Sequence, residues 1–239
     1  PYEISIEKCS LIFKKLGAGA VDKIKANPYI LCDDNIGVSF EKAEIIAQNL
    51  GFDYDCFDRI SAGIIYILRK NLQNGHTCLP EDKLASVAQR LLMVENEKIT
   101  RSLDILVENL RLMLYKKESD NFYALPEQYY AELYISARLK SNYKNIDPDF
   151  KIDDLELDYV ENKIGIKFEE IQRRAVKQAF LSGVLILTGG PGTGKTTTLN
   201  AIIQIYENRN ASIALAAPTG RAAKRMTELT GREAKTIHR

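Results

Sequence analysis

A glycine-rich stretch, GGPGTGKTTT, occupies residues 189–198 and directly follows the apolar run VLILT at residues 184–188. Its Gly189, Gly194, Lys195 and Thr196 meet the spacing G-x-x-x-x-G-K-[ST]. Glycines let a backbone curl until its N–H groups converge on phosphate oxygens, and the N-terminus of a following helix favours negative charge. The stretch therefore predicts a phosphate-binding loop (P-loop) for a nucleoside triphosphate, since a chance glycine turn does not explain the flanking strand and helix.

Lys195 and Thr196 carry the chemistry in this prediction, which makes them the candidate catalytic residues. We expect the Lys195 ammonium to reach the β- and γ-phosphate oxygens of ATP. We expect the Thr196 hydroxyl to hold Mg²⁺ and so to be the candidate metal ligand.

Gln172 lies 17 residues before Gly189, in FEEIQRRAVKQAF. A glutamine amide can donate to and accept from an adenine edge, although an exposed helical glutamine is the commoner explanation. The candidate ATP-binding residues are Gln172, Gly190, Gly192, Thr193, Gly194, Lys195, Thr196 and Thr197.

The elements around the loop alternate between helical and strand patterns. Amphipathic stretches at residues 155–164 and 168–181 precede the apolar run, which we expect to be a strand; a helix at 195–207 and a strand at 211–217 follow the loop. Strands that are apolar on both faces indicate a buried parallel sheet. Two strands cannot close such a core, so we expect a truncated α/β domain over residues 150–239.

The N-terminal part reads as mainly helical. Helices are expected over residues 40–50, from an N-cap at Asp55 to residue 74, from Pro80, from Thr100, and over 126–143. RLMLYKK and FYAL, separated by ESDN at residues 118–121, predict a β-hairpin. With the helices from Pro80 and Thr100 it is either a winged-helix module or a plain hairpin that covers the bundle. We expect regions at residues 1–75 and 76–145, with a linker at 142–154.

The bulk composition excludes several classes of protein. The formal net charge of +1 argues against a tail-driven nucleic-acid binder, but residues 201–239 hold seven Lys and Arg against three Asp and Glu. Cys9, Cys32, Cys56 and Cys78 form no CxxC pair, and we expect them to be reduced core thiols. No apolar run approaches the length of a membrane span, so we expect a soluble, cytoplasmic protein.

The strand at residues 211–217 ends in Pro218, Thr219 and Gly220, and a helix with Arg221, Lys224 and Arg225 begins there. Backbone N–H groups at that turn and the nearby cations suit a phosphate backbone. A solvated basic helix face is the alternative.

The run from Gln172 to Arg239, with TGGPGTGKTTTLNAI, APTGRAAKRMTELTG and AKTIHR, resembles the front of the motor in RecD-like superfamily 1 DNA helicases, the exodeoxyribonuclease V alpha chain family. The resemblance implies a RecA-like domain in which Gln172 reads adenine and the loop binds phosphates. It also implies contacts with single-stranded DNA from the motifs APTGR and TIHR. The candidate DNA-binding residues are Pro218, Thr219, Gly220, Arg221, Thr236 and His238.

The upstream segments NPYIL, IGVSFEKAEIIAQNLG, RISAGIIYIL and NGHTCLP resemble the helix-hairpin-helix region that precedes the motor in longer, stand-alone members. The hairpin of that region normally carries Gly-x-Gly, whereas this chain has Gly37, Val38 and Ser39. A Cβ at the third position limits the approach of a phosphate to the backbone, which argues against a DNA contact there.

The resemblance implies the N-terminal portion of an ATP-dependent 5′-to-3′ DNA helicase. After Ala217 the acidic residues are Glu228 and Glu233, and neither ends a strand. We therefore assign neither an acidic pair that holds magnesium nor an arginine finger. We expect ATP hydrolysis by this stretch alone to be near background. Another P-loop ATPase, such as a loader or switch, and a non-catalytic DNA-binding or docking module are the alternatives. The expected partner is single-stranded DNA, and the sequence indicates no particular protein partner.

Overall fold

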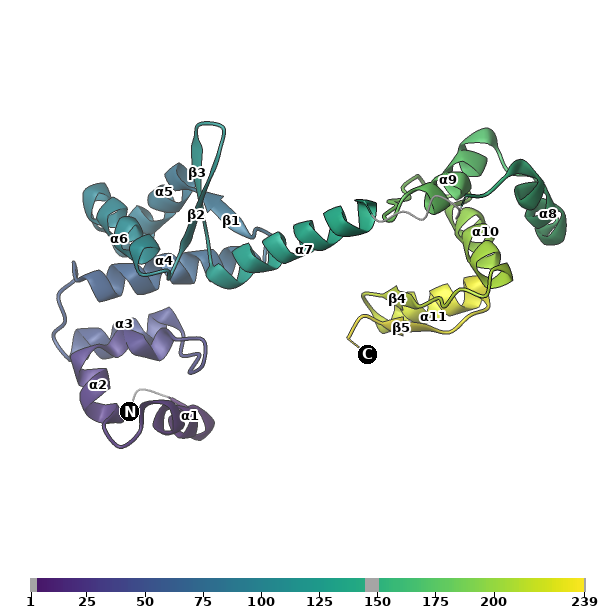
Figure 1. Ribbon diagram of the computed structural model, residues 1–239. Helices are drawn as coiled ribbons and strands as arrows, with labels where there is room; N and C mark the ends of the chain where they lie inside the picture. Colours follow the sequence, from purple (N-terminus) through teal and green to yellow (C-terminus); the bar gives the residue numbers. More distant parts are fainter. Residues whose placement is uncertain (1–3, 145–150, 239) are drawn as a thin grey trace. The chain divides into compact units, whose positions relative to one another are not determined.

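The computed structural model describes residues 4–144 and 151–238, which Figure 1 shows in chain order. The chain divides into two compact units, Pro1–Tyr134 and Ile135–Arg239, and the division falls within helix α7 (Pro126–Lys144). Of the linker predicted at residues 142–154, residues 145–150 lie outside the described residues, residues 142–144 belong to α7, and Asp154 begins α8.

The first unit begins with four short helical elements. They are α1 (Ile6–Leu16), α2 (Ala20–Ala26), the 3-10 helix η1 (Pro28–Cys32) and α3 (Phe40–Asn49). Ser5 and Ser39 cap α1 and α3, because their hydroxyls accept the backbone N–H groups of Lys8 and Lys42. Their apolar faces enclose a small core of Ile12, Ala20, Leu31, Ile36, Val38 and Ile46.

Helix α4 (Phe57–Leu72) is the centre of the larger core in this unit. It packs against α5 (Glu81–Leu92), where a Cβ on Gly63 would lie 2.6 Å from the Leu92 side chain. The prediction of Asp55 as its N-cap is wrong: the cap position is Cys56, without a side-chain bond. The helix expected from Thr100 is α6 (Asn96–Glu108), which begins four residues earlier because Ile99 is already needed in the core.

A three-stranded antiparallel sheet completes the first unit. The predicted hairpin is confirmed as β2 (Met113–Lys117) and β3 (Asp120–Ala124), with a tighter turn at Glu118 and Ser119. The third strand, β1 (Cys78–Pro80), pairs with β3 and was not predicted, because three residues ending in proline have no strand pattern.

The chain order α4, β1, α5, α6, β2, β3 places the hairpin beside α5, as both the winged-helix and the plain-hairpin interpretations require. Leu114 and Tyr123 on one face of the hairpin pack against the core. The exposed positions of α6 include Glu97, Asp104 and Glu108 and also Arg101. Both interpretations of this sheet therefore stay predictions.

The second unit contains three helices around one core. They are α8 (Asp154–Ile164), α9 (Glu170–Leu181) and α10 (Lys195–Asn208), which correspond to the two amphipathic stretches and to the helix predicted at 195–207. Leu157 and Val160 from α8, Val176 and Phe180 from α9, and Ala201 and Ile205 from α10 are buried together.

The strand predicted at residues 184–188 does not form in the structure. Ile186 is 84% exposed, and no strand among the described residues pairs with this segment. The prediction failed because an apolar run becomes a central strand only when neighbouring strands satisfy its backbone and cover both faces.

The second strand prediction holds in part. Only β4 (Leu215–Ala217) forms from the expected run 211–217, and it pairs in parallel with the unpredicted β5 (Ala234–Thr236). Helix α11 (Gly220–Thr230) connects them. The parallel pairing agrees with an α/β arrangement, but the pair is not deeply buried, because Ala216 and Lys235 are exposed.

The cysteines differ from expectation. Cys9 is exposed and the other three are half-buried, so none is a fully buried core thiol. Burial nevertheless raises the pKa of the Cys32 thiol to about 12, which keeps it protonated at neutral pH. Among the helices in the described ranges, none is long and apolar enough to cross a membrane.

A buried ion pair fixes α4 against α3. The Arg59 side chain is 4% exposed, and its guanidinium contacts both carboxylate oxygens of Glu44 at 2.8–3.0 Å. Arg59 also donates to the carbonyl oxygens of Tyr54 and Leu92 at 2.8 and 3.0 Å. Every hydrogen bond of this guanidinium therefore joins separate segments of the first unit.

Arg59→Met should lower the free energy of unfolding by about 3 kcal/mol, because the Glu44 carboxylate, 17% exposed, loses its cation and keeps the hydrogen bond from the Tyr29 hydroxyl. Urea unfolding followed by circular dichroism measures the loss. Lys98→Met, which breaks the exposed pair with Asp55, is the control and should barely move the midpoint. Equal effects of the two substitutions would contradict a structural role for the buried pair.

Candidate nucleotide-binding site

The glycine-rich loop leads directly into α10, whose N-cap is Gly194. Gly192 and Gly194 both have φ of +76°, a conformation that residues with a side chain rarely adopt. Thr198 anchors the start of the helix, because its N–H and its hydroxyl both bond to the Gly194 carbonyl, at 2.9 and 3.1 Å. The N–H groups of the first helical turn have no intrahelical acceptor, which leaves them for an anion.

The Lys195 side chain folds back over this loop. Its ammonium donates to the Gly189 carbonyl at 2.6 Å and also to the Gly190 carbonyl. The Thr193 hydroxyl donates to the same Gly190 carbonyl at 2.9 Å. The ammonium therefore lies over the turn, where a phosphate oxygen can replace the carbonyl oxygens as its partner. Thr196 and Thr197 lie beside it in the first helical turn and are half-buried.

The structure places Gln172 against the same loop. Its side-chain Nε2 donates to the Thr193 carbonyl at 3.3 Å, and its Oε1 accepts the Glu169 N–H at 3.0 Å. Together with the Glu169 carboxylate it forms a capping box at the start of α9. A Cβ at Gly194 would lie 2.1 Å from Nε2, so the amide is packed directly on the loop backbone.

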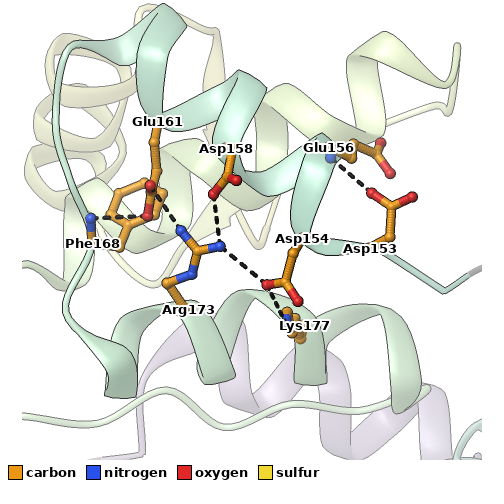
Figure 2. A network of polar contacts seen from close by, with 8 residues as sticks. All are labelled: Asp153, Asp154, Glu156, Asp158, Glu161, Phe168, Arg173 and Lys177. Atoms are coloured by element: carbon orange, nitrogen blue, oxygen red, sulfur yellow. Dashed lines mark hydrogen bonds and ion pairs between the residues drawn. The ribbon is translucent and has the colours of Figure 1, made fainter.

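Arg173, which the sequence analysis did not single out, lies next to Gln172 at the centre of a polar network (Figure 2). Its guanidinium contacts Asp154, Asp158 and Glu161 of α8 at 3.1, 2.8 and 2.8 Å. These carboxylates, with Asp158 foremost, raise the pKa of Arg173. The sequence did contain a signal for this network, because the spacing of Asp154, Asp158 and Glu161 places them on one face of a helix.

The candidate DNA-binding residues gather at one edge of the parallel pair. In the register of β4 and β5, Ala217 lies opposite Thr236, and Ile237 donates its N–H to the Ala217 carbonyl at 3.0 Å. Pro218, Thr219, Gly220 and Arg221 after β4, and His238 after β5, are exposed at this edge; Thr236 is half-buried. Thr219 caps α11 by accepting the Ala222 N–H at 3.2 Å. Arg239 lies outside the described residues.

The hairpin at Gly37, Val38 and Ser39 has other roles in the structure. Val38 is buried in the small core and Ser39 caps α3. The Gly37 N–H already bonds to the Asp33 carbonyl at 2.7 Å. These internal contacts agree with the expectation that this hairpin is unsuited to a phosphate.

Acidic residues that could hold a metal do not gather in this unit. Within residues 4–144 and 151–238, no group of three or more His, Cys, Asp or Glu side chains is placed to hold a metal ion. Glu228 is exposed on α11, and Glu233 faces Lys235 at 3.9 Å.

Two family models match separate parts of the chain. The model described as the ATP-dependent RecD2 DNA helicase HHH domain matches residues 1–78. The model described as an AAA domain matches residues 172–239, which include the loop, Gln172 and the sheet edge. The order of the two matches is that of the resemblance found in the sequence.

Similar proteins include the ATP-dependent RecD2 DNA helicase of Deinococcus radiodurans, 28% identical over 99% of this chain and 34% of the relative. The RecBCD enzyme subunit RecD of Mycolicibacterium smegmatis is 42% identical over 34% of this chain and 18% of its own length. An uncharacterized protein of Methanocaldococcus jannaschii is 27% identical over the whole chain and 24% of its own length.

The chain thus spans about a third or less of the length of these relatives. Three matches agree: a domain model specific to RecD2 at the start of the chain, an AAA model at its end, and a RecD2 relative aligned over 99% of the chain. The chain is therefore similar to RecD2-like helicases along its length, with a RecD2 helix-hairpin-helix model matched at residues 1–78 and an AAA model matched at residues 172–239.

Proposed function

We propose that the chain is the nucleotide-binding N-terminal portion of an ATP-dependent helicase that moves 5′ to 3′ along single-stranded DNA. The observation that carries this proposal is the convergence of three groups, from the two helices α9 and α10, on one loop. The Gln172 amide from α9, the Lys195 ammonium and the N-terminus of α10 all meet at Gly189–Thr196. The direction of movement is carried over from the family resemblance.

The loop fits the tail of a triphosphate. Nothing lies within 4 Å of a Cβ built on Gly192, so an anion can approach the backbone closely there. The Lys195 ammonium would exchange the Gly189 and Gly190 carbonyls for β- and γ-phosphate oxygens, and the helix N-terminus would add its N–H groups. These interactions bind the phosphates and neutralise charge on the one that is transferred.

Gln172 fits an adenine base in its present orientation. Nε2 donates one N–H to the Thr193 carbonyl, and one lone pair of Oε1 accepts the Glu169 N–H. An amide has a second N–H and a second lone pair. Adenine offers the acceptor N7 and the donor N6, whereas guanine offers two acceptors at the same edge, so this amide favours ATP over GTP.

Thr196 is the residue that would hold Mg²⁺, together with the phosphates. Its hydroxyl lies in the first turn of α10, beside the residue that contacts the phosphates. A bound Mg²⁺ would supply Lewis acidity toward the phosphoryl oxygens. Among the described residues, Thr196 is the single Mg²⁺ ligand that we propose.

The edge formed by β4, β5 and α11 would contact the DNA strand. The exposed N-terminus of α11 offers backbone N–H groups, and Arg221 offers a cation at the same turn. Ends of parallel strands are a common place for ligands, because the loops that follow them lie together. Movement of this edge when ATP binds would move its contacts along the DNA strand.

Lys195→Ala should lower DNA-stimulated ATP hydrolysis in the intact protein by about 10²–10³-fold, because it removes the ammonium that neutralises the negative charge of the transferred phosphate. Steady-state phosphate release measures this effect. Lys167→Ala, an exposed lysine of the same unit, is the control and should leave the rate unchanged. Unwinding that persists in the Lys195 variant would contradict the proposed site.

Binding of single-stranded DNA should weaken with salt at a log–log slope of about −2 to −3, if the edge contacts about three phosphates. Arg221→Ala should make that slope shallower by about 0.7, the value of one phosphate contact on a single strand. Fluorescence anisotropy of a labelled oligonucleotide over a salt series gives both slopes. An unchanged slope in the variant would show that Arg221 does not contact the DNA.

A further inference from the structure

We propose that the acidic face of α8, acting through Arg173, is the device that positions Gln172 and thereby sets the preference for adenine. This inference rests on the proposed function of the same site. It assigns Arg173 as a positioning residue that acts through its neighbour and does not touch the nucleotide itself. The carboxylates that hold Arg173 are Asp154, Asp158 and Glu161.

Figure 2 shows how the guanidinium points into the space between α8 and α9. One terminal nitrogen contacts Asp154 at 3.1 Å and Asp158 at 2.8 Å, and the other contacts Glu161 at 2.8 Å. A guanidinium is planar and presents its donors in a fixed fork, so three acceptors from one helix determine its orientation as well as its position.

Glu161 extends this restraint to the connection between the two helices. Its side chain is 7% exposed, and its Oε1 accepts the buried Phe168 N–H at 3.0 Å. Helix α8 ends at Gly165 with φ of +73°, and the chain turns there toward α9. Glu161 thus fixes both the guanidinium and the start of the following segment.

The restraint then passes into the first turn of α9. The Arg173 N–H bonds to the Glu169 carbonyl at 2.9 Å, and the capping box joins Glu169 to Gln172 in the same turn. Gln172 in turn reaches the Thr193 carbonyl and lies against Gly194. A contiguous set of contacts therefore leads from α8 to the phosphate loop.

Stability accounts for the pair with Glu161, which is 7% exposed, but not for the other two pairs. The Asp154 and Asp158 side chains are 68% and 54% exposed, and ion pairs with such exposed groups contribute little to folding. Lys177 also contacts Asp154 at 2.7 Å, so that carboxylate has a second cation. Arg173 joins three carboxylates of α8 to the first turn of α9, beside Gln172, and small misplacements of a binding group strongly reduce its effect.

The test is the ratio of the GTP and ATP dissociation constants of the intact protein, measured by titration calorimetry. A well-placed pair of hydrogen bonds to a base gives discrimination of about fivefold to a hundredfold. Arg173→Met should lower the ratio by about fivefold or more, mainly by weakening ATP binding. Arg173→Lys should give a ratio between those of the wild type and Arg173→Met, because one ammonium cannot satisfy three separated carboxylates.

Arg209→Met is the matched control. Arg209, at the end of α10, makes a two-point ion pair with Glu156 of α8, at 2.5 and 3.1 Å. Its contact with α9 is at the C-terminal end, where the guanidinium lies 5.3 Å from the Phe180 ring, and not in the turn that holds Gln172. Its loss should lower the melting temperature and leave the GTP/ATP ratio unchanged. Should Arg173→Met prove unfolded, Asp158→Asn removes one carboxylate, keeps the guanidinium and should lower the ratio in the same direction.

The outcomes separate this inference from the proposed function. Wild-type protein that binds neither nucleotide would overturn the proposed function itself. Wild-type protein that prefers ATP, together with an Arg173 variant of unchanged ratio, would overturn only the positioning role. An equal fall of the ratio in the Arg209 variant would also overturn it, because any loosened ion pair on α8 would then suffice.

Discussion

The contact between the Gln172 amide and the backbone at Gly194 is the constraint on which the nucleotide site depends. It exists because position 194 has no Cβ, since an added Cβ would lie 2.1 Å from the amide nitrogen. The same glycine must adopt φ of +76° to start α10. One residue therefore satisfies two requirements, the turn that gathers N–H groups for phosphate and the space that lets a base-reading side chain rest on the loop.

The second unit builds outward from that contact with polar rather than apolar restraints. Its core of α8, α9 and α10 is small, and ion pairs fix the helices at their ends. Arg173 joins α9 to α8, Arg209 joins the end of α10 to α8, and Arg232 joins Glu207 of α10 to the segment before β5. Directional pairs of this kind set angles between helices, which apolar packing leaves less strictly defined.

The sequence predicted those features whose signals are local. The P-loop spacing, α10, α3 and the β2–β3 hairpin follow from short-range patterns of glycine, caps and alternation. The prediction of a strand at residues 184–188 was wrong, because strand formation depends on partners elsewhere in the chain. β1 and β5 were missed for the same reason: each has three residues and is defined by its neighbour. Arg173 was missed because its role depends on α8 folding back against α9.

The most direct measurement compares nucleotide preference in Gly194→Ala and Gly192→Ala, two substitutions at the same φ of +76°. Both should weaken binding of ATP and GTP by straining the loop. Only Gly194→Ala adds a methyl group against Gln172, because the position at Gly192 has nothing within 4 Å. The account predicts that the preference for ATP over GTP disappears in the Gly194 variant and persists in the Gly192 variant. The same preference in both variants would contradict it.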